Sequence, residues 1–293
     1  MKEKLFSVLM SVYYNDNPKY LRAAVESVSI KQTLQPKELI LVVDGPVPEL
    51  VKSEIKALCG EIPYIKTLWK PLNEGLGKAL RDGVLIATYH IIARMDSDDI
   101  SSPTRFEQQI KCMEQDDNID IVGGSISEFI DTPDNIVGYR TVPDSDAEIK
   151  DYMKSRCALN HMSVMFKKES VLKVGNYQDW YWNEDYYLWI RMQLNGCKFA
   201  NITENLVNVR VGKDMYARRG SMKYFKSEKG IQKFMLENKL IGYPRYCFNV
   251  LVRFMVQVVM PNCLRGFLFQ KIFQKNFRKS GDFGCAFHTP LSK

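Results

Sequence analysis

Short runs of consecutive apolar residues alternate, along the first hundred residues, with segments whose apolar positions recur every three or four residues. The runs are typical of strands buried on both faces, and the spaced positions are typical of helices that cover a sheet. The apolar runs are Phe6–Tyr14, Glu38–Val43, Tyr64–Trp69 and His90–Met95. The segments with helical spacing are the one after Pro18, Leu50–Leu58 and Gly75–Ala87. This alternation predicts an α/β fold with a mainly parallel sheet flanked by helices.

The second half of the chain continues the pattern with less regularity. The predicted elements are a helix from Pro103 to about Asp116, strands at Ile119–Ile130 and 162–167, a short helix from Asp144, a helix at Glu184–Asn195 and helical segments from about Gly220 onward. No repeat or low-complexity linker separates them. We therefore expect one compact body followed by a helical tail.

Composition and charge add one feature to this picture. Hydrophobic residues make up 45% and charged residues 26% of the 293 residues, as in soluble globular proteins. The chain has a net charge of +7, and the segment between Pro244 and Lys279 contains seven basic residues and no acidic one. This segment therefore accounts for the whole positive excess. Such a segment suits an anionic membrane surface or nucleic acid, and the neutral remainder makes nucleic acid the less favoured partner. The seven scattered cysteines contain no C-x-x-C pair, which favours a reducing compartment.

An acidic cluster, Asp96-Ser97-Asp98-Asp99, directly follows the fourth apolar run. Residues i and i+2 of an extended segment share a face, so Asp96 and Asp98 can converge on one hard cation such as Mn²⁺ or Mg²⁺. Such a cation would offset the charge of a departing diphosphate. The other interpretation is a solvated acidic turn, with Asp99 at the entry of the helix that begins at Pro103.

A second group of candidates lies on the same side of the predicted sheet. Asp44 ends the second apolar run, where a carboxylate can accept a hydrogen bond from a nucleobase or simply shape a Gly-Pro turn. Asn73 precedes a glycine-containing helix entry that can approach phosphates, although the spacing of a Walker A loop is absent. Lys78 and Arg81 on that helix can reach a diphosphate or remain solvated.

A third set of candidates comprises residues at the start of the helix at Glu184 and, separately, one histidine. Glu184 and Asp185 suit the positive end of a helix dipole without any further role, but a carboxylate that faces a cleft is also a suitable base for an alcohol. Trp182 offers a flat apolar face that can line a small-molecule site or belong to the core. His161, one of three histidines, is either a site residue or a hydrogen-bonded structural residue.

The joint order and spacing of these segments resemble glycosyltransferase family 2, the inverting enzymes of the GT-A fold. The matching segments are Ser7–Asn15 (SVLMSVYYN), Val42–Gly45 (VVDG), Asn73–Gly75 (NEG), Met95–Asp99 (MDSDD) and Glu184–Trp189 (EDYYLW). Within the family, the chain is similar to bacterial galactosyl- or glucosyltransferases of O-antigen, capsule and amylovoran assembly. The Q-x-x-R-W motif of the polymer-making members is absent, and so is any apolar run of the roughly 18 residues needed to span a membrane. A single sugar addition is therefore expected.

The resemblance implies a role for each candidate residue. On the donor side, Asp44 would contact the uracil of a UDP-sugar and Asp96 the ribose and the metal region, with Asn73, Lys78 and Arg81 nearby. Asp98 would ligate the metal ion together with Asp96. On the acceptor side, Asp185 would be the catalytic base, and Glu184, His161 and Trp182 would bind a lipid-linked saccharide.

The resemblance also implies an organisation in three parts. Residues 1–110 would form the Rossmann-like nucleotide-sugar-binding half, residues 111–219 the acceptor-binding half and residues 220–293 a helical, basic tail. In the tail, apolar residues recur at helical spacing at Leu264, Phe267, Leu268, Ile272, Phe273 and Phe277. This spacing favours a helix in an anionic membrane interface, while packing on the body is the alternative. The enzyme would be cytoplasmic and peripheral on the inner face of the membrane.

Two other classes of protein are weighed against this interpretation. A sugar-nucleotide pyrophosphorylase would carry a glycine-rich, arginine-containing loop after the first strand, where this chain has Tyr13-Tyr14-Asn15-Asp16-Asn17. A non-enzymatic membrane adaptor would account for the basic tail but not for separate acidic positions at strand and helix ends.

Overall fold

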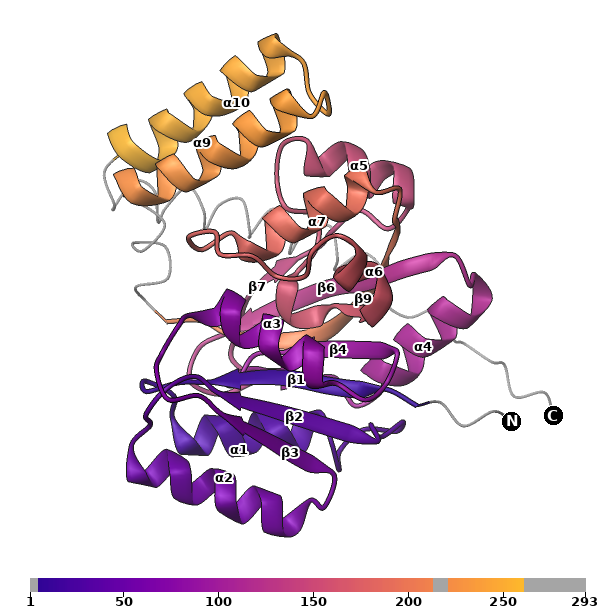
Figure 1. The fold of residues 1–293 in the computed structure, drawn as a ribbon, viewed down its shortest axis with the longest axis vertical. Coiled ribbons are helices and arrows are strands. Elements are labelled where there is room, and N and C mark those ends of the chain that lie inside the picture. Colours follow the sequence, from indigo (N-terminus) through magenta and orange to yellow (C-terminus); the bar gives the residue numbers. More distant parts are fainter. Residues whose placement is uncertain (1–4, 213–220, 261–293) are drawn as a thin grey trace, which may run out of the picture.

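The computed structural model of the protein describes residues 5–212 and 221–260. The predicted membrane helix of the tail lies outside these residues. Strands and helices alternate through the first half, as predicted (Figure 1). The elements of this half are β1 (Ser7–Val12), α1 (Pro18–Ser27), β2 (Glu38–Val43), α2 (Glu49–Glu61), β3 (Ile65–Trp69), α3 (Leu76–Ile86), β4 (Ile91–Met95), β5 (Ile100–Ser101) and α4 (Arg105–Gln115).

The second half adds longer strands and a pair of C-terminal helices. Its elements are β6 (Ile119–Phe129), β7 (Ile136–Arg140), α5 (Asp146–Met153), the 3₁₀ turn η1 (His161–Ser163), β8 (Met165–Lys167), α6 (Lys168–Lys173), α7 (Glu184–Leu194), β9 (Lys198–Arg210), α9 (Met222–Glu237), α10 (Tyr243–Phe254) and the π-helical turn η2 (Met255–Val259). One prediction is corrected here: only the last part of 162–167 is a strand, because η1 occupies its start. The strands β5, β7 and β9 and the short helix α6 were not predicted.

The strands form one continuous sheet with the order β3-β2-β1-β4-β8-β6-β9-β5, and β7 pairs with β6. The first four strands are parallel, so their carboxyl ends share one edge of the sheet. Strand β8 is antiparallel to both β4 and β6 and links the two halves of the chain. The sheet therefore crosses the predicted boundary near residue 110 without a break, and the division into halves stays a prediction.

Two hydrophobic clusters cover the two faces of this sheet. On β1, Val8 and Met10 belong to the cluster that contains the helices α1, α2 and α4, whereas Leu9 belongs to the cluster that contains α3, α7 and α9. Successive residues of a strand point to opposite faces, so a strand buried on both sides is apolar throughout. Helix α1 begins as predicted, with Asn17 as N-cap and Pro18 at its first position.

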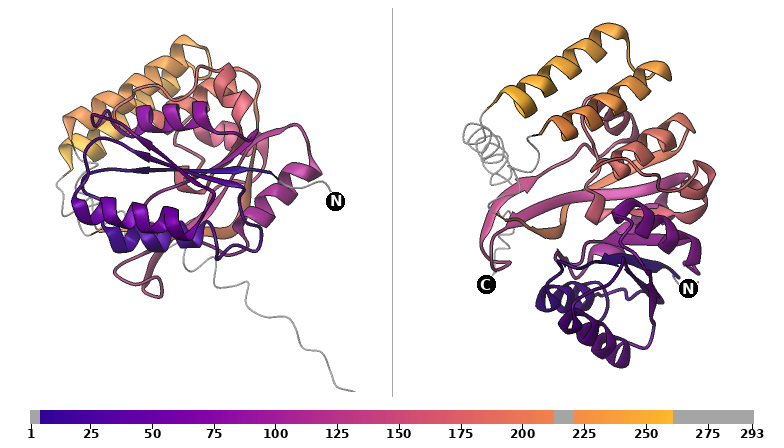
Figure 2. Two further views of the ribbon diagram at one scale, coloured as in Figure 1. Left: turned by 60° about the horizontal axis from the view of Figure 1, so that its bottom comes forward. Right: turned by 60° about the vertical axis from the view of Figure 1, so that its left-hand side comes forward.

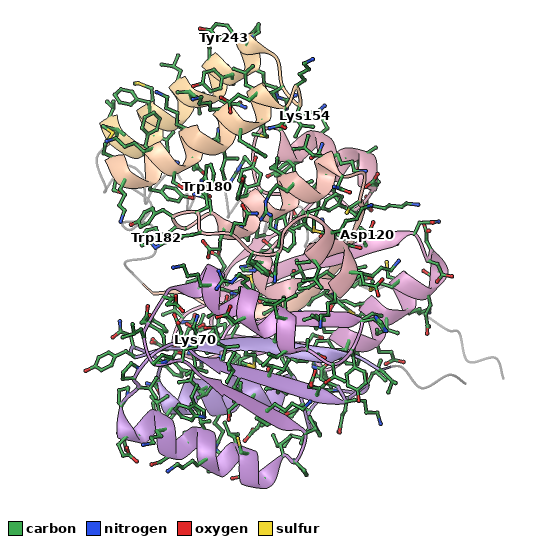
Figure 3. All side chains as sticks on the ribbon, in the orientation of Figure 1. Lys70, Asp120, Lys154, Trp180, Trp182 and Tyr243 are labelled. Carbon is green, nitrogen blue, oxygen red and sulfur yellow. The ribbon has the colours of Figure 1, made fainter. Side chains whose placement is uncertain are left out.

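Helices α9 and α10 form a hairpin at the end of the molecule opposite α2 (Figures 1 and 2). Trp180 joins the hairpin to the body, because its indole N–H donates to the Ser227 carbonyl oxygen at 3.1 Å. A Cβ on Gly230 would lie 2.8 Å from the Trp180 ring, so glycine allows this close approach. Figure 3 shows Trp180 and Trp182 on the side of the hairpin that faces the body. Within the described residues, no helix combines the length and apolar character needed to cross a membrane.

Candidate active site

Asp44, at the carboxyl end of β2, holds the turn that precedes α3. Its carboxylate accepts hydrogen bonds from the backbone N–H groups of Glu74 (3.0 Å) and Gly75 (2.8 Å), and the Asn73 amide donates to its carbonyl oxygen (3.1 Å). The neighbouring Gly45 permits this contact, since its φ is +89° and a Cβ would lie 2.5 Å from the Asn73 backbone nitrogen. The structure thus brings Asp44 and Asn73 together, and the contact of Asp44 with a nucleobase stays a prediction.

Lys70, a residue that the sequence pattern did not single out, is buried beside this turn. Its ammonium group lies 2.9 Å from the carboxylates of Glu74 and Asp82 and 3.7 Å from that of Asp44. The side chain is only 6% exposed. Three carboxylates around one buried cation stabilise the arrangement of β2, β3 and α3 at the carboxyl edge of the sheet.

Lys78 and Arg81, the predicted donor-side cations, lie on α3 with partly exposed side chains. Lys78 is 3.7 Å from Glu74, and Arg81 is 3.0 Å from the adjacent Asp82. Surface ion pairs of this kind contribute about 1 kcal/mol or less, so both cations can exchange these partners for an anion near the start of α3. Their contact with a diphosphate stays a prediction.

Four carboxylates gather beyond the carboxyl end of β4. Asp96, Asp98 and Asp99 belong to the predicted cluster, and Asp16 joins them from the loop after β1 by accepting a hydrogen bond from the Ser97 hydroxyl (3.0 Å). Displacement of water and repulsion from Asp96 raise the pKa of Asp98 to about 6, although its side chain reaches the surface. Burial, above all, raises the pKa of Asp16 to about 6 as well. The cluster therefore carries mutually repelling negative charge.

Asp99 takes a different place from the one its sequence position suggested. It is buried, and one carboxylate oxygen accepts from the Arg210 backbone N–H of β9 at 2.8 Å, while the other has no hydrogen-bond partner among the described residues. Helix α4 begins at Arg105 with Thr104 as its N-cap. Asp99 is thus not the helix-entry residue, because the chain forms the short strand β5 before α4 begins.

Arg94, on β4, is the buried cation at the centre of the site. Its side chain is 2% exposed, and one guanidinium nitrogen lies 2.5 Å from Asp96. The other two guanidinium nitrogens have no hydrogen-bond partner among the described residues. The charge of Arg94 also acts on Glu184 and Asp185, where it lowers their pKa values against the larger effect of burial. Arg94 therefore connects the acidic cluster electrostatically to the start of α7.

The acidic cluster fits a divalent cation that also binds substrate oxygens. Asp98 faces like charges, the buried Asp99 has an unpaired oxygen, and Arg94 pairs with Asp96 alone among these carboxylates. All donors are carboxylate oxygens, which Mg²⁺ and Mn²⁺ prefer. No group of three or more His, Cys, Asp or Glu side chains in 5–212 and 221–260 is arranged to hold a metal ion. The arrangement matches a cation held by one or two carboxylates plus substrate phosphates.

Glu184 and Asp185 open α7 and face different surroundings. Asp185 lines a cleft beside the C-terminal hairpin, and burial raises the pKa of its carboxyl group. Glu184 packs against the start of α3, where a Cβ on Gly77 would lie 3.3 Å from the Glu184 Cβ. Burial and the charge of Asp185 raise the pKa of Glu184 to about 7. The two predicted residues therefore face different parts of the molecule, Glu184 the start of α3 and Asp185 the cleft.

His161 and Trp182 lie at the same cleft as Asp185. The His161 ring forms a hydrogen bond of 2.9 Å with the Tyr177 hydroxyl, and burial lowers the pKa of His161 well below its usual range, so the ring is neutral near pH 7. Trp182 stacks on Tyr181 with ring centroids 5.0 Å apart and is 50% exposed. Its φ of +55° is uncommon for an aromatic residue, and such strained positions cluster at functional sites.

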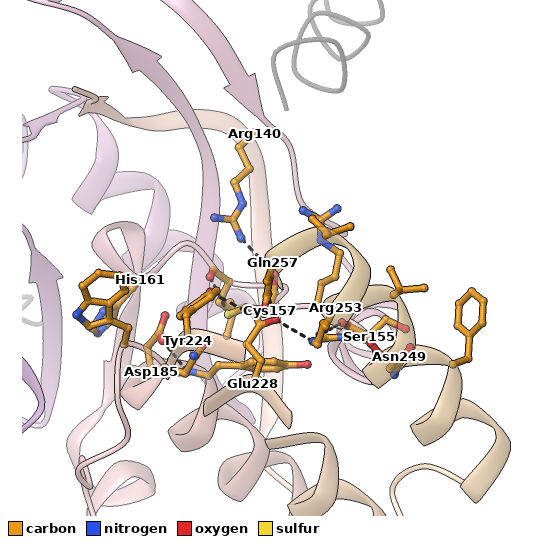
Figure 4. A pocket seen from close by; sticks show the side chains of 18 of the residues that line it. Arg140, Ser155, Cys157, His161, Asp185, Tyr224, Glu228, Asn249, Arg253 and Gln257 are labelled. Atoms are coloured by element: carbon orange, nitrogen blue, oxygen red, sulfur yellow. Dashed lines mark hydrogen bonds and ion pairs between the residues drawn. The ribbon is translucent and has the colours of Figure 1, made fainter. Parts of the chain in front are cut away.

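The cleft has a volume of about 590 Å³ and separates the body from the hairpin (Figure 4). His161 and Asp185 lie at one side of it in this view, and Arg253 and Asn249 at the other. Its lining side chains come from β7, the segment 155–162, α7, α9, α10 and η2. Three of them, Arg140, Arg156 and Arg253, carry positive charge and were not predicted. No local motif marks these arginines, because Arg140 and Arg253 are more than a hundred residues apart in the sequence.

The chain matches proteins of one family over most of its length. The sequence model described as "Glycosyl transferase family 2" matches residues 7–173. The amylovoran biosynthesis glycosyltransferase AmsE of Erwinia amylovora is 36% identical, over 91% of this chain and 98% of AmsE. The UDP-Gal:alpha-D-GlcNAc-diphosphoundecaprenol beta-1,3-galactosyltransferase of Escherichia coli is 34% identical, over 92% of this chain and 97% of that enzyme.

Solved structures show the same fold at low sequence identity. S. aureus TarS in complex with UDP-GlcNAc superimposes with a TM-score of 0.63 at 15% identity, covering 85% of this chain and 72% of that chain. The mannosyltransferase PcManGT from Pyrobaculum calidifontis, in complex with GDP-Man and Mn²⁺, has a TM-score of 0.60 at 12% identity, covering 96% and 76% of the two chains. These likenesses confirm the predicted GT-A fold.

Proposed function

The chain belongs to glycosyl transferase family 2, and we propose that this glycosyltransferase moves a hexose, galactose or glucose, from a UDP-sugar to a saccharide linked to a polyprenyl diphosphate. The proposal places the enzyme in the synthesis of a bacterial surface polysaccharide. Support comes from the relatives, one of which is named for amylovoran synthesis and one for a galactosyl transfer to a diphosphoundecaprenol-linked sugar. Family membership sets aside the pyrophosphorylase and the adaptor.

One observation carries the proposal: the start of α7 lies between the carboxyl edge of the sheet and the cleft. Glu184, predicted to bind the acceptor, packs against α3, and the charges of Arg94 and Asp96 act on it. The adjacent Asp185 lines the cleft. A sugar held by its diphosphate at the edge of the sheet would therefore meet an acceptor held in the cleft at this helix start.

Asp185 is the base in the proposed reaction. Its carboxylate takes the proton from the acceptor hydroxyl, the hydroxyl oxygen forms a bond to the anomeric carbon, and the bond from that carbon to the UDP oxygen breaks with its electron pair leaving on UDP. Attack from the side opposite the leaving group inverts the anomeric configuration. The raised pKa of Asp185 makes the carboxylate a better proton acceptor than a solvated aspartate. The neutral His161 ring, held by Tyr177, would orient the acceptor beside it.

Asp96 and Asp98 would hold Mn²⁺ or Mg²⁺, which when bound offsets the negative charge of the departing UDP. Asp44 and Asn73, fixed to each other at the end of β2, would contact the nucleoside, and Lys78 and Arg81 the diphosphate. The lipid-linked acceptor implies an enzyme at the inner face of the cytoplasmic membrane. The basic segment after Pro244 supports this location through its attraction to anionic headgroups.

The test is a donor screen followed by analysis of the product. UDP-galactose, UDP-glucose and UDP-N-acetylhexosamines are incubated with the enzyme and Mn²⁺, with and without a diphosphate-linked acceptor, and UDP release is measured. We expect acceptor-dependent UDP release with one of the hexoses, and a product whose new linkage is β by NMR when the donor is α. Transfer of only an N-acetylhexosamine would refute the donor assignment, and retention of configuration would refute the inverting mechanism.

A further inference from the structure

The cleft beside the hairpin contains two chemically different walls. One contains Asp185, His161 and Trp182, which suit a sugar, and continues into Arg140 and Arg156. The other is the face of α10 and η2 that carries Phe248, Val252, Val256 and Met260. Positions i, i+4 and i+8 of a helix lie on one face, so the first three of these apolar residues form a row about 12 Å long.

The three arginines of the cleft are not equivalent. Arg253 is committed to the fold, since it forms an ion pair of 2.9 Å with Glu228 and donates to the Ser155 carbonyl oxygen at 2.5 Å. Arg156 is exposed, and its side chain forms no hydrogen bond or ion pair with the other residues that the structure describes. Arg140 is half-buried, and its positive charge acts on Asp185.

Charge and polarity change from one side of the cleft to the other. Figure 4 shows Asp185 at one side, Asn249 and Arg253 of α10 at the other, and Arg140 between them. The Arg156 backbone lies beside Arg140 and Arg253, because the carbonyl oxygens of its neighbours Cys157 and Ser155 accept hydrogen bonds from these two arginines. The Glu228 carboxylate in the same cleft is paired with Arg253. Phe248 (66% exposed) and Val252 (42% exposed) both line the cleft, and contiguous exposed apolar side chains of this kind are typical of ligand-binding grooves.

We propose that this cleft binds the acceptor through its diphosphate and lipid: Arg156, with Arg140 beside it, binds the diphosphate, and Phe248, Val252 and Val256 cover the first part of the polyprenyl chain. The inference rests on the proposed function and deepens it, because it assigns two parts of the acceptor to named residues. An amphiphile with a sugar, then two phosphates, then an apolar chain has the same order of chemistry as the cleft. Guanidinium groups bind phosphates through paired charge-assisted hydrogen bonds.

The test measures binding of farnesyl diphosphate, a short polyprenyl diphosphate, by calorimetry. The full-length enzyme is first saturated with UDP and Mn²⁺, so that the donor region cannot bind the added diphosphate. Arg156→Gln should weaken binding roughly tenfold or more, the usual effect of losing a hydrogen bond to a charged group. The control Lys233→Gln removes an exposed charge from α9, outside the cleft, and should leave binding unchanged.

The apolar wall is tested in the same way. Phe248→Ala should weaken binding of farnesyl diphosphate roughly tenfold, because the complex loses the apolar area that the ring and the lipid would bury against each other. Dimethylallyl diphosphate has a single isoprene unit and buries less apolar area, so the same variant should weaken its binding less. The control Leu251→Ala removes an exposed side chain of α10 that does not line the cleft and should change neither affinity.

The outcomes separate this inference from the proposed function. If UDP binds with Mn²⁺ but farnesyl diphosphate does not bind to that complex, the inference is wrong and the proposed function stands. Equal losses of affinity for farnesyl diphosphate in Arg156→Gln and Lys233→Gln would show that only the general surface charge matters, and this result would also overturn the inference. If UDP itself fails to bind, the proposed function is wrong, and the inference falls with it.

Discussion

The carboxyl edge of the sheet and the cleft beside the hairpin are built in opposite ways. The edge is acidic, and its side chains follow the ends of consecutive parallel strands: Asp44 follows β2 and Asp96 follows β4. The cleft contains three arginines and an apolar row, and its residues come from five separate segments of the chain. An acidic region suits a cation that carries a diphosphate, whereas a basic and apolar region suits an anionic lipid. Under the proposed function, the donor and the acceptor both carry a diphosphate but are bound by different chemistry.

The largest effect is expected at the junction of the two regions. Asp185→Asn keeps the shape of the side chain but removes the proton acceptor, so kcat should fall by roughly 10²–10⁴. The affinity for UDP should change little, because Asp185 lines the cleft. Steady-state kinetics with saturating donor and acceptor measure the effect. A near-normal kcat in a correctly folded variant would move the base to another residue, and Glu184→Gln would be tested next.

The next effect concerns the acidic edge. Asp98→Asn, or a chelator added to the wild type, should lower activity by roughly 10²–10³, since loss of several kcal/mol of charge stabilisation has this effect on a rate. Excess Mn²⁺ should restore the chelated enzyme fully and the variant only in part. Full turnover in excess EDTA would show that Asp96 and Asp98 do not hold a metal ion that the reaction needs.

A smaller effect is expected in the turn that presents Asp44. Gly45→Ala should destabilise the protein by about 1–3 kcal/mol, because alanine at a positive φ is strained and the added Cβ would meet the Asn73 backbone. Gly60→Ala is the matched control: it lies in α2 with no atom near the added Cβ and should stabilise by about 0.5–1 kcal/mol. Chemical denaturation measures both. Equal changes in the free energy of unfolding of the two variants would show that the close contact of Gly45 with Asn73 is not needed for stability.

The smallest effect is a pH dependence of stability at Glu184. Its pKa rises from 4.5 to about 7 on folding, so the native state keeps a proton that the unfolded chain has released between these values. Stability should therefore decrease as the pH rises through this window. Glu184→Gln should be more stable than the wild type at pH 8 by roughly 1–2 kcal/mol, since the group is partly exposed, and similar at pH 4.5. An equal stability difference at both pH values would contradict the raised pKa.

The same contrast explains what the sequence could predict. Alternating apolar runs and helical stripes are local patterns, so β1 to β4 and the helices between them follow from the sequence, and strand-end residues such as Asp96 and Asp98 follow from the order of those strands. Strand β8 lies between β4 and β6 and is antiparallel to both. These pairings join residues that are far apart in the sequence, so no local pattern predicts them.

The cleft was only partly predictable, for a physical reason. Asp185 and Trp182 were candidates because of their chemical type and their position near the start of one predicted helix, and His161 was a candidate as one of three histidines. Arg140, Arg156 and Phe248 became neighbours of this site only when β7, the 155–162 segment and α10 packed together. Lys70 is similar: it follows an ordinary strand end, and only the fold shows that three carboxylates surround it.

The most direct test of the division between the two regions is calorimetric titration of UDP into Asp98→Asn and Asp185→Asn in the presence of Mn²⁺. The account predicts that Asp98→Asn loses much of the Mn²⁺-dependent affinity for UDP, because its carboxylate belongs to the acidic edge. Asp185→Asn should bind UDP as the wild type does while it fails to transfer the sugar. Unchanged UDP affinity in Asp98→Asn, together with a loss in Asp185→Asn, would contradict the assignment of donor and acceptor to these two regions.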